Sequence, residues 1–432
     1  VTLPMNQATA AGTVSTPNAW VHIADDNSIT LLMARSEMGQ GVYTSMPMLL
    51  AEELNVNLNQ IKLLDAPPKE VYVNALLGAQ ITGGSTSVRE AWDKLRIAGA
   101  QVRDMLRMAA AQAWGVDMAS VRAENATLIG PNGKRASYGQ MAAAASKLPV
   151  PEKPSIKEPK DFRIVGTPAK RLDTPAKVNG SAQFGIDVKL PGMVYASIRQ
   201  CPVIGGSVKS VDDAAAKAMP GVQSVVQLPG AVAVVADTWW RAKKATEALK
   251  ITWDEGALAA ISDRSMTEDT RKALSTGKVL EIAKPNGDVA SAMKGAARVI
   301  EAEYVIPLQS HSPLEPMNFT AHAQGDQMFL IGPTQFQQGA QGAVAAALGM
   351  KPENITLKTT YLGGGFGRRI ELDFIVQAAQ ISKAVNKPVK LVWTREEDMT
   401  HDFYRPLGVN TVKAGVDANG MPVAMHFKVA SQ

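Results

Sequence analysis

The sequence predicts a mixed α/β protein built from several segments. Its 432 residues are enough for two to four domains, and a content of 46% hydrophobic and 20% charged residues is that of an ordinary folded protein. Short strand-like runs alternate with helical patterns along most of the chain. Five prolines between residues 149 and 168 interrupt this alternation and predict an extended linker.

The first stretch of the chain begins with a predicted hairpin, in which strands at residues 20–24 and 28–34 flank an Asp-Asp-Asn turn. A helix is expected over residues 46–54, and a long one over residues 88–114, where apolar side chains recur at helical spacing. Glycine commonly ends helices, so Gly115 is expected to end this one. The apolar face of the long helix is formed by Trp92, Leu95, Val102, Leu106 and Ala109.

The second stretch, about residues 171–253, predicts a small α+β or α/β unit. Its expected strands are residues 194–199, 222–228 and 231–236, and its expected helices are residues 211–218 and 240–249.

The third stretch starts near residue 291 and has the same character. Its expected strands are residues 297–305, 328–332, 355–360 and 389–393, and its expected helices are residues 337–348 and 372–385. A last strand-like run at residues 423–430 meets the end of the sequence, where unpaired backbone groups would remain. We therefore expect the polypeptide to be incomplete or to be completed by another chain. The polar stretch up to Asn18 is expected to be the remnant of a removed leader or the start of a shortened chain.

Charge and cysteine content exclude several classes of protein. The 45 basic and 40 acidic residues give a net charge of +5, spread along the chain, whereas nucleic-acid-binding proteins concentrate basic residues on one element. The single cysteine, Cys201, excludes an internal disulfide and any zinc or iron–sulfur site made from this chain's thiolates. If the chemistry is redox chemistry, electrons must leave through another subunit. No apolar run approaches the roughly 18 residues of a membrane span.

Three glycine-rich loops carry polar side chains at strand-to-helix transitions, at residues 37–41, 78–87 and 363–369. Glycine lets the backbone approach a ligand closely, and a helix start offers N–H groups to phosphate. A single such loop is common, but three favour a large phosphate-bearing cofactor held by several segments. Neither a GxGxxG fingerprint nor a P-loop is present, which disfavours a simple nicotinamide enzyme or a P-loop NTPase.

Other polar residues allow two interpretations. The amide of Gln335, after Pro333 and Thr334, could contact a ligand, or Thr334 and Gln335 could simply cap the next helix. The spacing of His311, Glu315 and His322 fits no zinc pattern, so we interpret them as ordinary polar loop residues.

Arg368 and Arg369 follow the third glycine loop. They could be a solvated helix start, but two cations there oppose the helix dipole, which favours an anion-binding role.

Taken together, the loops resemble the molybdopterin-binding subunit of the xanthine oxidase and aldehyde oxidase family. The nearest branch is the isoquinoline 1-oxidoreductase β-subunit type, which includes related periplasmic aldehyde dehydrogenases. The resemblance covers essentially the whole chain and depends on residues 36–41, 83–89, 172–180, 333–335 and 362–369. In better-known members the Met-Gly-Gln-Gly loop follows the Gly-Gly-Gly-Phe-Gly loop. Here it precedes that loop, which is the permuted order of the isoquinoline-type branch.

The resemblance implies an α/β hammerhead domain flanked by segments of the molybdenum cofactor-binding domain. The implied division is an N-terminal cofactor-binding segment at 1–148, a proline-rich linker at 149–168, the hammerhead at 169–258, and a second cofactor-binding segment at 259–432 that is incomplete at its C-terminus.

The implied cofactor is molybdopterin cytosine dinucleotide, whose molybdenum is held through the pterin dithiolene with no protein ligand. Gln335 would lie near a molybdenum-bound oxygen, and Phe366 with its neighbours would direct backbone N–H groups at the oxo ligands; these two are the catalytic candidates. The implied cofactor-binding residues are Gly39, Gln40, Gly41, Gly84, Ser85, Thr86, Ser87, Gln335, Gly364, Gly365, Phe366, Gly367 and Arg368.

The implied reaction inserts a water-derived oxygen at the C–H carbon of an aldehyde or N-heteroaromatic small molecule. Electrons would pass to a small partner subunit with 2Fe–2S clusters, with a cytochrome c as one candidate for the next acceptor. The implied location is the periplasm.

Two departures from the family pattern bear on this reaction. Many relatives read Gly-Gly-Gly-Phe-Gly-Gly-Lys where this chain has Arg368 and Arg369. The family's general base, a glutamate in a Gly-x-Gly-Glu loop, is absent, so we expect it on a C-terminal half or a separate chain. The alternative is a catalytically silent fragment or assembly subunit that binds cofactor or partner without turnover. A third, weaker hypothesis is a nucleotide-binding enzyme of another kind.

Overall fold

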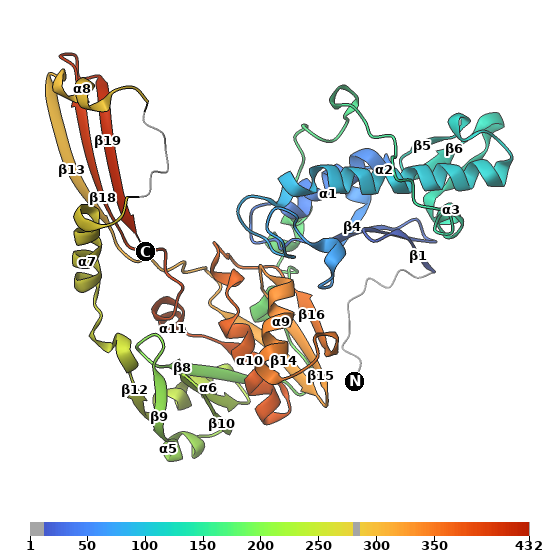
Figure 1. The fold of residues 1–432 in the computed structure, drawn as a ribbon. Coiled ribbons are helices and arrows are strands. Elements are labelled where there is room, and N and C mark those ends of the chain that lie inside the picture. The colour runs from blue at the N-terminus through green and yellow to red at the C-terminus, as the bar shows by residue number, and fades with distance from the viewer. Residues whose placement is uncertain (1–12, 280–285, 432) are drawn as a thin grey trace.

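The computed structural model describes residues 13–279 and 286–431. A helix-rich N-terminal part, a central sheet with helices, and a long narrow sheet follow one another, so the mixed α/β class is confirmed (Figure 1). Within the described ranges, no helix is both long and apolar enough to cross a membrane. Residues 1–12, part of the expected leader remnant, lie outside the described residues.

The N-terminal part places a four-stranded sheet beside two packed helices. The sheet is formed by β1 (Val14–Asn18), β2 (Val21–Ala24), β3 (Ile29–Met33) and β4 (Ile61–Asp65). The helices are α1 (Val42–Leu54) and α2 (Ser87–Trp114), and beyond them lie β5 (Arg122–Glu124), β6 (Thr127–Ile129), β7 (Arg135–Ser137) and α3 (Tyr138–Ala145). The predicted hairpin and the long helix are confirmed, and Gly115 ends that helix with a left-handed φ of 65°. Helix α1 starts earlier than predicted, directly after Gly41.

The proline-rich linker at 149–168 contains neither a strand nor an α-helix, as predicted, but it is firmly docked on α1. Fully buried Glu52 accepts hydrogen bonds from the backbone N–H groups of Arg163, Ile164 and Val165. Fully buried Glu53 accepts from the backbone N–H of Lys157 at 3.1 Å. Two helix carboxylates therefore satisfy linker donors that no regular element satisfies.

The central sheet has seven strands in the order β10-β11-β8-β17-β14-β15-β16. They are β8 (Val194–Gln200), β10 (Val222–Leu228), β11 (Ala231–Ala236), β14 (Asn318–Gln324), β15 (Gln327–Gly332), β16 (Ile355–Thr359) and β17 (Pro388–Val392). Strand β17 pairs with β8 in parallel, with Val389 opposite Val194. The predicted unit at 169–258 therefore shares its sheet with the segment at 259–432.

Helices cover both faces of this sheet where β11 lies. Ala233 and Val235 belong to the core that includes α10 (Asp373–Val385). Val232 and Val234 face the smaller core that includes α6 (Trp239–Glu247). Every residue of β11 is consequently buried, as expected for a strand covered on both sides. The predicted helix after β15 is confirmed as α9 (Gln337–Leu348).

The helix predicted at residues 211–218 is confirmed only in part. Residues Ser207–Asp212 form strand β9, which pairs antiparallel with β12 (Lys250–Asp254), and only Ala214–Lys217 forms a short helix, α5. Pairing with a distant strand satisfies the backbone N–H and C=O groups that would otherwise form hydrogen bonds within a helix. The valines of this segment also favour a strand.

The third sheet exposes its apolar face. Strand β18 (Gly408–Val416) lies between β13 (Arg298–Ile306) and β19 (Pro422–Ser431), and the helices α7 (Asp263–Thr276) and α8 (Val289–Lys294) precede it in the chain. One face carries apolar side chains with exposed fractions of 42–59%, namely Ile300, Tyr304, Met425, Phe427 and Val429. The other face carries charged residues and meets the helices. This is the reverse of the usual arrangement, in which the polar face of an antiparallel sheet meets water.

Lys390, in the middle of β17, gives a prediction for stability. Its side chain is 2% exposed, its ammonium donates to the Ile186 carbonyl, and burial lowers its pKa to about 8. Between pH 8 and roughly 10.5 the unfolded chain holds a proton that the folded chain has released, so stability rises with pH there. We expect Lys390→Met to remove about 2 kcal/mol of this rise. Urea unfolding of both proteins at pH 7, 8, 9 and 10 measures the difference, and parallel pH profiles would contradict it.

Candidate functional site

Two of the three glycine loops, the first and the third, lie at the carboxyl ends of parallel strands. Strands β15 and β16 are parallel with Gly332 opposite Thr359, so the segments that follow them leave the sheet at one edge. The loop at 36–41 similarly follows β3, which is parallel to β4. In open α/β sheets this edge is where ligands bind.

Gln335 joins three of these segments although it is only 2% exposed. Its amide nitrogen donates to the Thr82 carbonyl at 2.9 Å, and the Thr82 N–H donates back to the Gln335 carbonyl at 2.7 Å. Its side-chain oxygen accepts from the Gly367 N–H at 3.2 Å, and its own N–H donates to the Arg369 carbonyl. The predicted site residue Gln335 is therefore a junction, rather than a helix cap.

Ser36 links the first loop to the same junction. Its hydroxyl donates to the Thr334 carbonyl at 2.7 Å and accepts from the Gln337 amide at 3.0 Å. Its N–H donates to the Thr82 hydroxyl at 2.8 Å, and nearby the Leu362 N–H donates to the Glu37 carbonyl. Segments from four parts of the chain thus form one site.

The third loop presents free backbone donors. Gly364, Phe366 and Gly367 have φ values of 95°, 55° and 109°. Across residues 13–279 and 286–431, the N–H groups of Gly364, Gly365 and Phe366 have no acceptor. Successive N–H groups in such a conformation form a nest for an anionic oxygen.

The first loop has open space at one of its glycines. A Cβ added at Gly39 would meet no atom within 4 Å, and the Gly39 φ of 113° strongly favours glycine there. The Met38 sulfur lies 3.0 Å from where a Cβ of Gly365 would be, so the first and third loops are adjacent. The open space at Gly39, together with the third-loop N–H groups that find no acceptor among the described residues, fits a cofactor with phosphate or oxo groups.

Gly365 gives a prediction at this junction. An added Cβ would lie 2.5 Å from the Gln335 side-chain oxygen, so Gly365→Ala must displace the amide that holds Thr82 and Gly367. We expect a loss of about 1–3 kcal/mol in unfolding free energy, together with weaker cofactor retention. Gly342→Ala in α9 is the matched control, because its Cβ meets nothing within 4 Å and alanine stabilises helices. Equal stability of both variants in urea would show that a Cβ at residue 365 is accommodated without displacing the Gln335 amide.

The second loop lies at the start of α2. Gly84 and Ser85 are exposed, and Ser85 has a left-handed φ of 54°. The Thr86 hydroxyl is already engaged, since it donates to the Gly83 carbonyl and accepts from Asn74. Ser87 is the first helical residue, and the first N–H groups of a helix lack partners within it. Gly84, Ser85 and the helix start therefore remain available to a ligand, whereas the Thr86 side chain is not free.

In the first loop, the Gln40 side chain folds back on its own backbone. Its oxygen accepts from the Met38 N–H at 2.7 Å and its nitrogen donates to the Ser36 carbonyl at 2.9 Å. Gln40 therefore shapes the loop, and Gly39 and Gly41, with φ values of 113° and 89°, provide its surface.

Sequence reasoning missed the residues that hold this loop. Fully buried Glu37 accepts from the Gly39 N–H at 2.8 Å, and the Arg171 guanidinium donates both to Glu37 and to the Gly39 carbonyl. Burial opposes ionisation of Asp173, but hydrogen bonds from Arg171 and Lys177 lower its pKa to about 2. Asp173 and Lys177 belong to the motif at 172–180, and Arg171 directly precedes it. That motif is the signal that could have pointed to these residues, although from the sequence alone we used it only to recognise the fold.

The prediction that Arg368 binds the cofactor does not agree with its surroundings. Its side chain is fully buried, forms a two-pronged pair with Asp373 at 2.8 and 2.9 Å, and lies 3.1 Å from Asp402. For Arg369 the alternative of a solvated helix start does not hold, because the side chain is fully buried against Glu315, and burial lowers its pKa to about 10. Both cations meet carboxylates of this chain.

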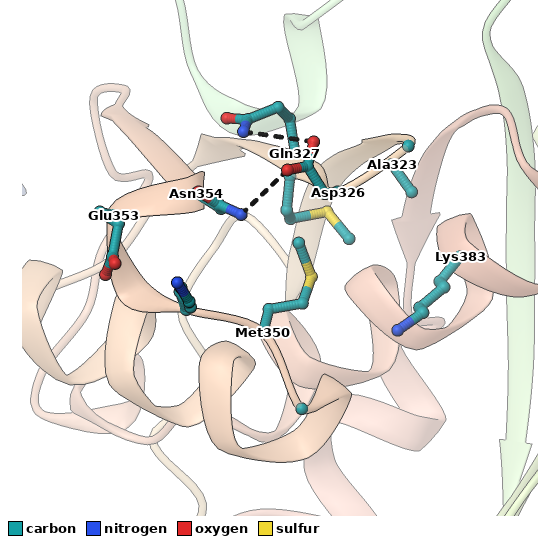
Figure 2. A pocket seen from close by; sticks show the side chains of 11 residues that line it. Ala323, Asp326, Gln327, Met350, Glu353, Asn354 and Lys383 are labelled. Atoms are coloured by element: carbon teal, nitrogen blue, oxygen red, sulfur yellow. Dashed lines mark hydrogen bonds between the residues drawn. The ribbon is translucent and has the colours of Figure 1, made fainter.

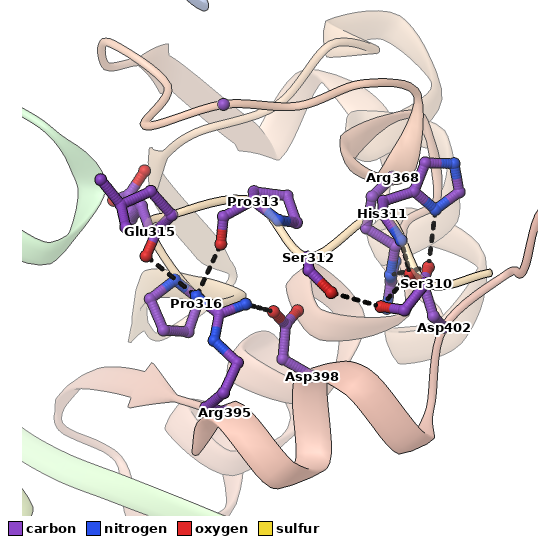
Figure 3. Close-up of polar contacts among 12 residues, drawn as sticks. Ser310, His311, Ser312, Pro313, Glu315, Pro316, Arg368, Arg395, Asp398 and Asp402 are labelled. Carbon is purple, nitrogen blue, oxygen red and sulfur yellow. Dashed lines mark hydrogen bonds and ion pairs between the residues drawn. The ribbon is translucent and has the colours of Figure 1, made fainter.

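His311 and Glu315 lie in the loop between β13 and β14, as interpreted, but Glu315 has more partners than a solvated loop residue. Glu315 is 8% exposed and its two oxygens accept from Gly363, Arg369, Ile186 and Asn318, so it anchors the third loop. His311 pairs with Asp402 beside that loop (Figure 3). The loop interpretation is wrong for His322, which lies within strand β14. Among the described residues no group of three His, Cys, Asp or Glu side chains could hold a metal ion.

A surface hollow of about 500 Å³ lies elsewhere. Figure 2 shows Asp326, Gln327, Met350 and Asn354 around it, at the end where β15 and β16 begin. The glycine loops leave the opposite end of these strands, so the hollow is not part of the site.

Comparison with protein families agrees with this geometry. A molybdopterin cofactor-binding domain model matches residues 272–432, which include the third loop. A second model with the same description matches residues 2–189, which include the first two loops. Neither match reaches into residues 190–271.

Several curated proteins are similar to the chain over most of its length. The β-subunit of isoquinoline 1-oxidoreductase from Brevundimonas diminuta is 31% identical over 93% of this chain and 57% of its own length. The membrane-bound aldehyde dehydrogenase [pyrroloquinoline-quinone] of Gluconacetobacter polyoxogenes is 32% identical over 99% and 56%. A nicotinate dehydrogenase chain of Pseudomonas putida is 25% identical over 95% and 35%. The chain thus spans little more than half the length of the first two. The chain belongs to the molybdopterin-binding subunits of the xanthine oxidase and aldehyde oxidase family.

Proposed function

We propose that the chain is the cofactor-binding part of a molybdenum hydroxylase-type oxidoreductase. Its substrate is an aldehyde or an N-heteroaromatic compound, oxidised with oxygen from water. The observation that carries the proposal is the set of N–H groups at Gly364, Gly365 and Phe366, which are unpaired within the described residues and lie beside Gln335.

The bound molybdenum pterin, as its cytosine dinucleotide, supplies a centre that transfers oxygen and accepts two electrons. The N–H groups of Gly365 and Phe366 bind an anionic oxygen, because donors fixed by the backbone need no reorganisation. Gln335 fixes these donors through Gly367. Ser85 and the start of α2 bind phosphate or the dinucleotide part.

Partner chains complete the proposed enzyme. The one cysteine, Cys201, is buried, so electrons leave through a small subunit that carries 2Fe–2S clusters, and from there to a cytochrome c. The general base comes from a segment outside this sequence, and the location proposed is the periplasm. Because a 2Fe–2S cluster needs several thiolates and this chain has a single cysteine, the clusters would have to be on another subunit.

The proposal is tested by analysing molybdenum, pterin and intact mass in protein purified from its native source. We expect both molybdenum and pterin, and oxidation of benzaldehyde or isoquinoline with a dye acceptor in the native complex. Cofactor without turnover in the native complex would favour the silent subunit. Absence of molybdenum and pterin would overturn the proposal, and pyrroloquinoline quinone in their place would assign the chain to the chemistry in the name of the Gluconacetobacter relative.

A further inference from the structure

His311 lies directly against the third glycine loop. A Cβ added at Gly367 would be 3.5 Å from its Nε2 atom, and the imidazole retains 21% exposure. Figure 3 shows the ring above Arg368 and Asp402, on the segment that continues to Glu315. Because Glu315 accepts from the Gly363 N–H at 2.8 Å, this segment is tied to the loop at a second point.

Asp402 fixes the orientation and the tautomer of this imidazole. Its side chain is 1% exposed, and its Oδ1 lies 2.9 Å from Nδ1 of His311. Its Oδ2 accepts from the Ser310 hydroxyl at 2.9 Å and from the backbone N–H of His311. A carboxylate can only accept, so the neutral ring carries its proton on Nδ1 and has a lone pair on Nε2.

That lone pair has no partner within residues 13–279 and 286–431. The charged groups that face the ring are Asp402, Arg368 and Glu371, and Arg368 is already neutralised by Asp402 and Asp373. The loop therefore offers backbone donors for one oxygen and, beside them, an imidazole acceptor for a neighbouring O–H or N–H group.

We propose that His311 is a ligand-binding residue whose Nε2 accepts a hydrogen bond from the molecule seated on the loop at 364–367, with Asp402 as its positioning residue. This inference rests on the proposed function, since the ligand is the pterin cofactor or the molecule bound beside it. The shared chemistry is an O–H or N–H donor adjacent to an anionic oxygen.

The test is ¹⁵N NMR of the imidazoles in the holoenzyme, labelled at histidine and kept at pH 8, above the pKa of about 6.5 of free histidine. The chain has five histidines, and the signal missing from His311→Gln assigns His311. We expect the Nε2 signal to differ between cofactor-free and cofactor-loaded protein if the donor belongs to the cofactor, or to move only on adding benzaldehyde if it belongs to the substrate. Asp402→Asn should shift the tautomer toward Nε2–H, which a purely structural residue would not do.

Variants give the second readout. His311→Ala should lose about tenfold in cofactor retention or in kcat, the effect of one hydrogen bond of this kind, whereas His311→Gln, which keeps an acceptor oxygen, should stay within about threefold of wild type. His322→Gln on β14 is the matched control.

The outcomes separate the two proposals. If wild type retains cofactor while Nε2 is indifferent to cofactor and benzaldehyde, and His311→Ala matches His322→Gln, the inference about His311 is wrong and the proposed function stands. If wild type binds neither molybdenum nor pterin, both fall.

Discussion

Replacing Glu37 with alanine is expected to lower the free energy of unfolding by about 3–5 kcal/mol and to abolish cofactor retention. The side chain is fully buried and accepts from the backbone N–H groups of Gly39, Gly41 and Tyr43 at 2.8–3.0 Å. Without it, these donors and the Arg171 guanidinium lose their common acceptor. Urea unfolding followed by circular dichroism, together with molybdenum analysis, measures both effects.

Two controls separate the charge of Glu37 from its hydrogen bonds. Glu37→Gln keeps one acceptor oxygen but leaves Asp173 as the only carboxylate paired with Arg171 among the described residues, so we expect an intermediate loss. Glu124→Ala, at an exposed position of β5, should change stability by less than about 0.5 kcal/mol. A Glu37→Ala protein within about 1 kcal/mol of wild type would mean that the loop is held by its glycines alone.

Replacing Arg368 with alanine is expected to cost a similar amount, about 3–5 kcal/mol, because it leaves Asp402 buried without its cation. The guanidinium is fully buried, pairs with Asp373 and Asp402, and stacks 5.4 Å from the Trp393 ring centroid. Arg368→Lys should recover only part of the loss, since an ammonium cannot form the same fork.

The matched control for Arg368 is an exposed pair of the same kind. Arg241 pairs with Asp237 on the surface near the start of α6, with roughly half of each side chain in water. Arg241→Ala should cost between zero and about 1 kcal/mol. If both arginine variants unfold at the same urea concentration, the burial of Arg368 does not increase its contribution to stability.

Local patterns were sufficient for much of the fold. The β2–β3 hairpin, the long helix α2 with Gly115 at its end, and α9 each depend on neighbours within a few turns, and the sequence predicted all three. The helix predicted at 211–218 began too early, because its first two residues belong to strand β9, whose partner β12 lies some forty residues further on. No local pattern reveals which distant strand will take up a segment's backbone donors.

The site residues also fall into those that local sequence predicts and those that depend on distant partners. Its glycines were predictable, because left-handed backbone such as that of Gly39 and Gly367 requires them. Its carboxylates were not, because Glu315 and Asp402 owe their roles to partners 48 and 91 residues away. The pair Arg368 and Arg369 misled for that reason: from sequence they are two free cations, and the anions that neutralise them come from other segments.

The parallel pairing of β8 with β17 also has a consequence for how the chain is made. Val194 pairs with Val389, so at about 5–20 residues per second the ribosome needs roughly 10–40 s after β8 before its partner exists. During that interval β8, β10 and β11 present an open apolar edge, the kind of surface on which nascent chains mispair. Synthesis of this protein therefore depends on protection of that edge, and the demand for chaperones should rise when translation slows between the two strands.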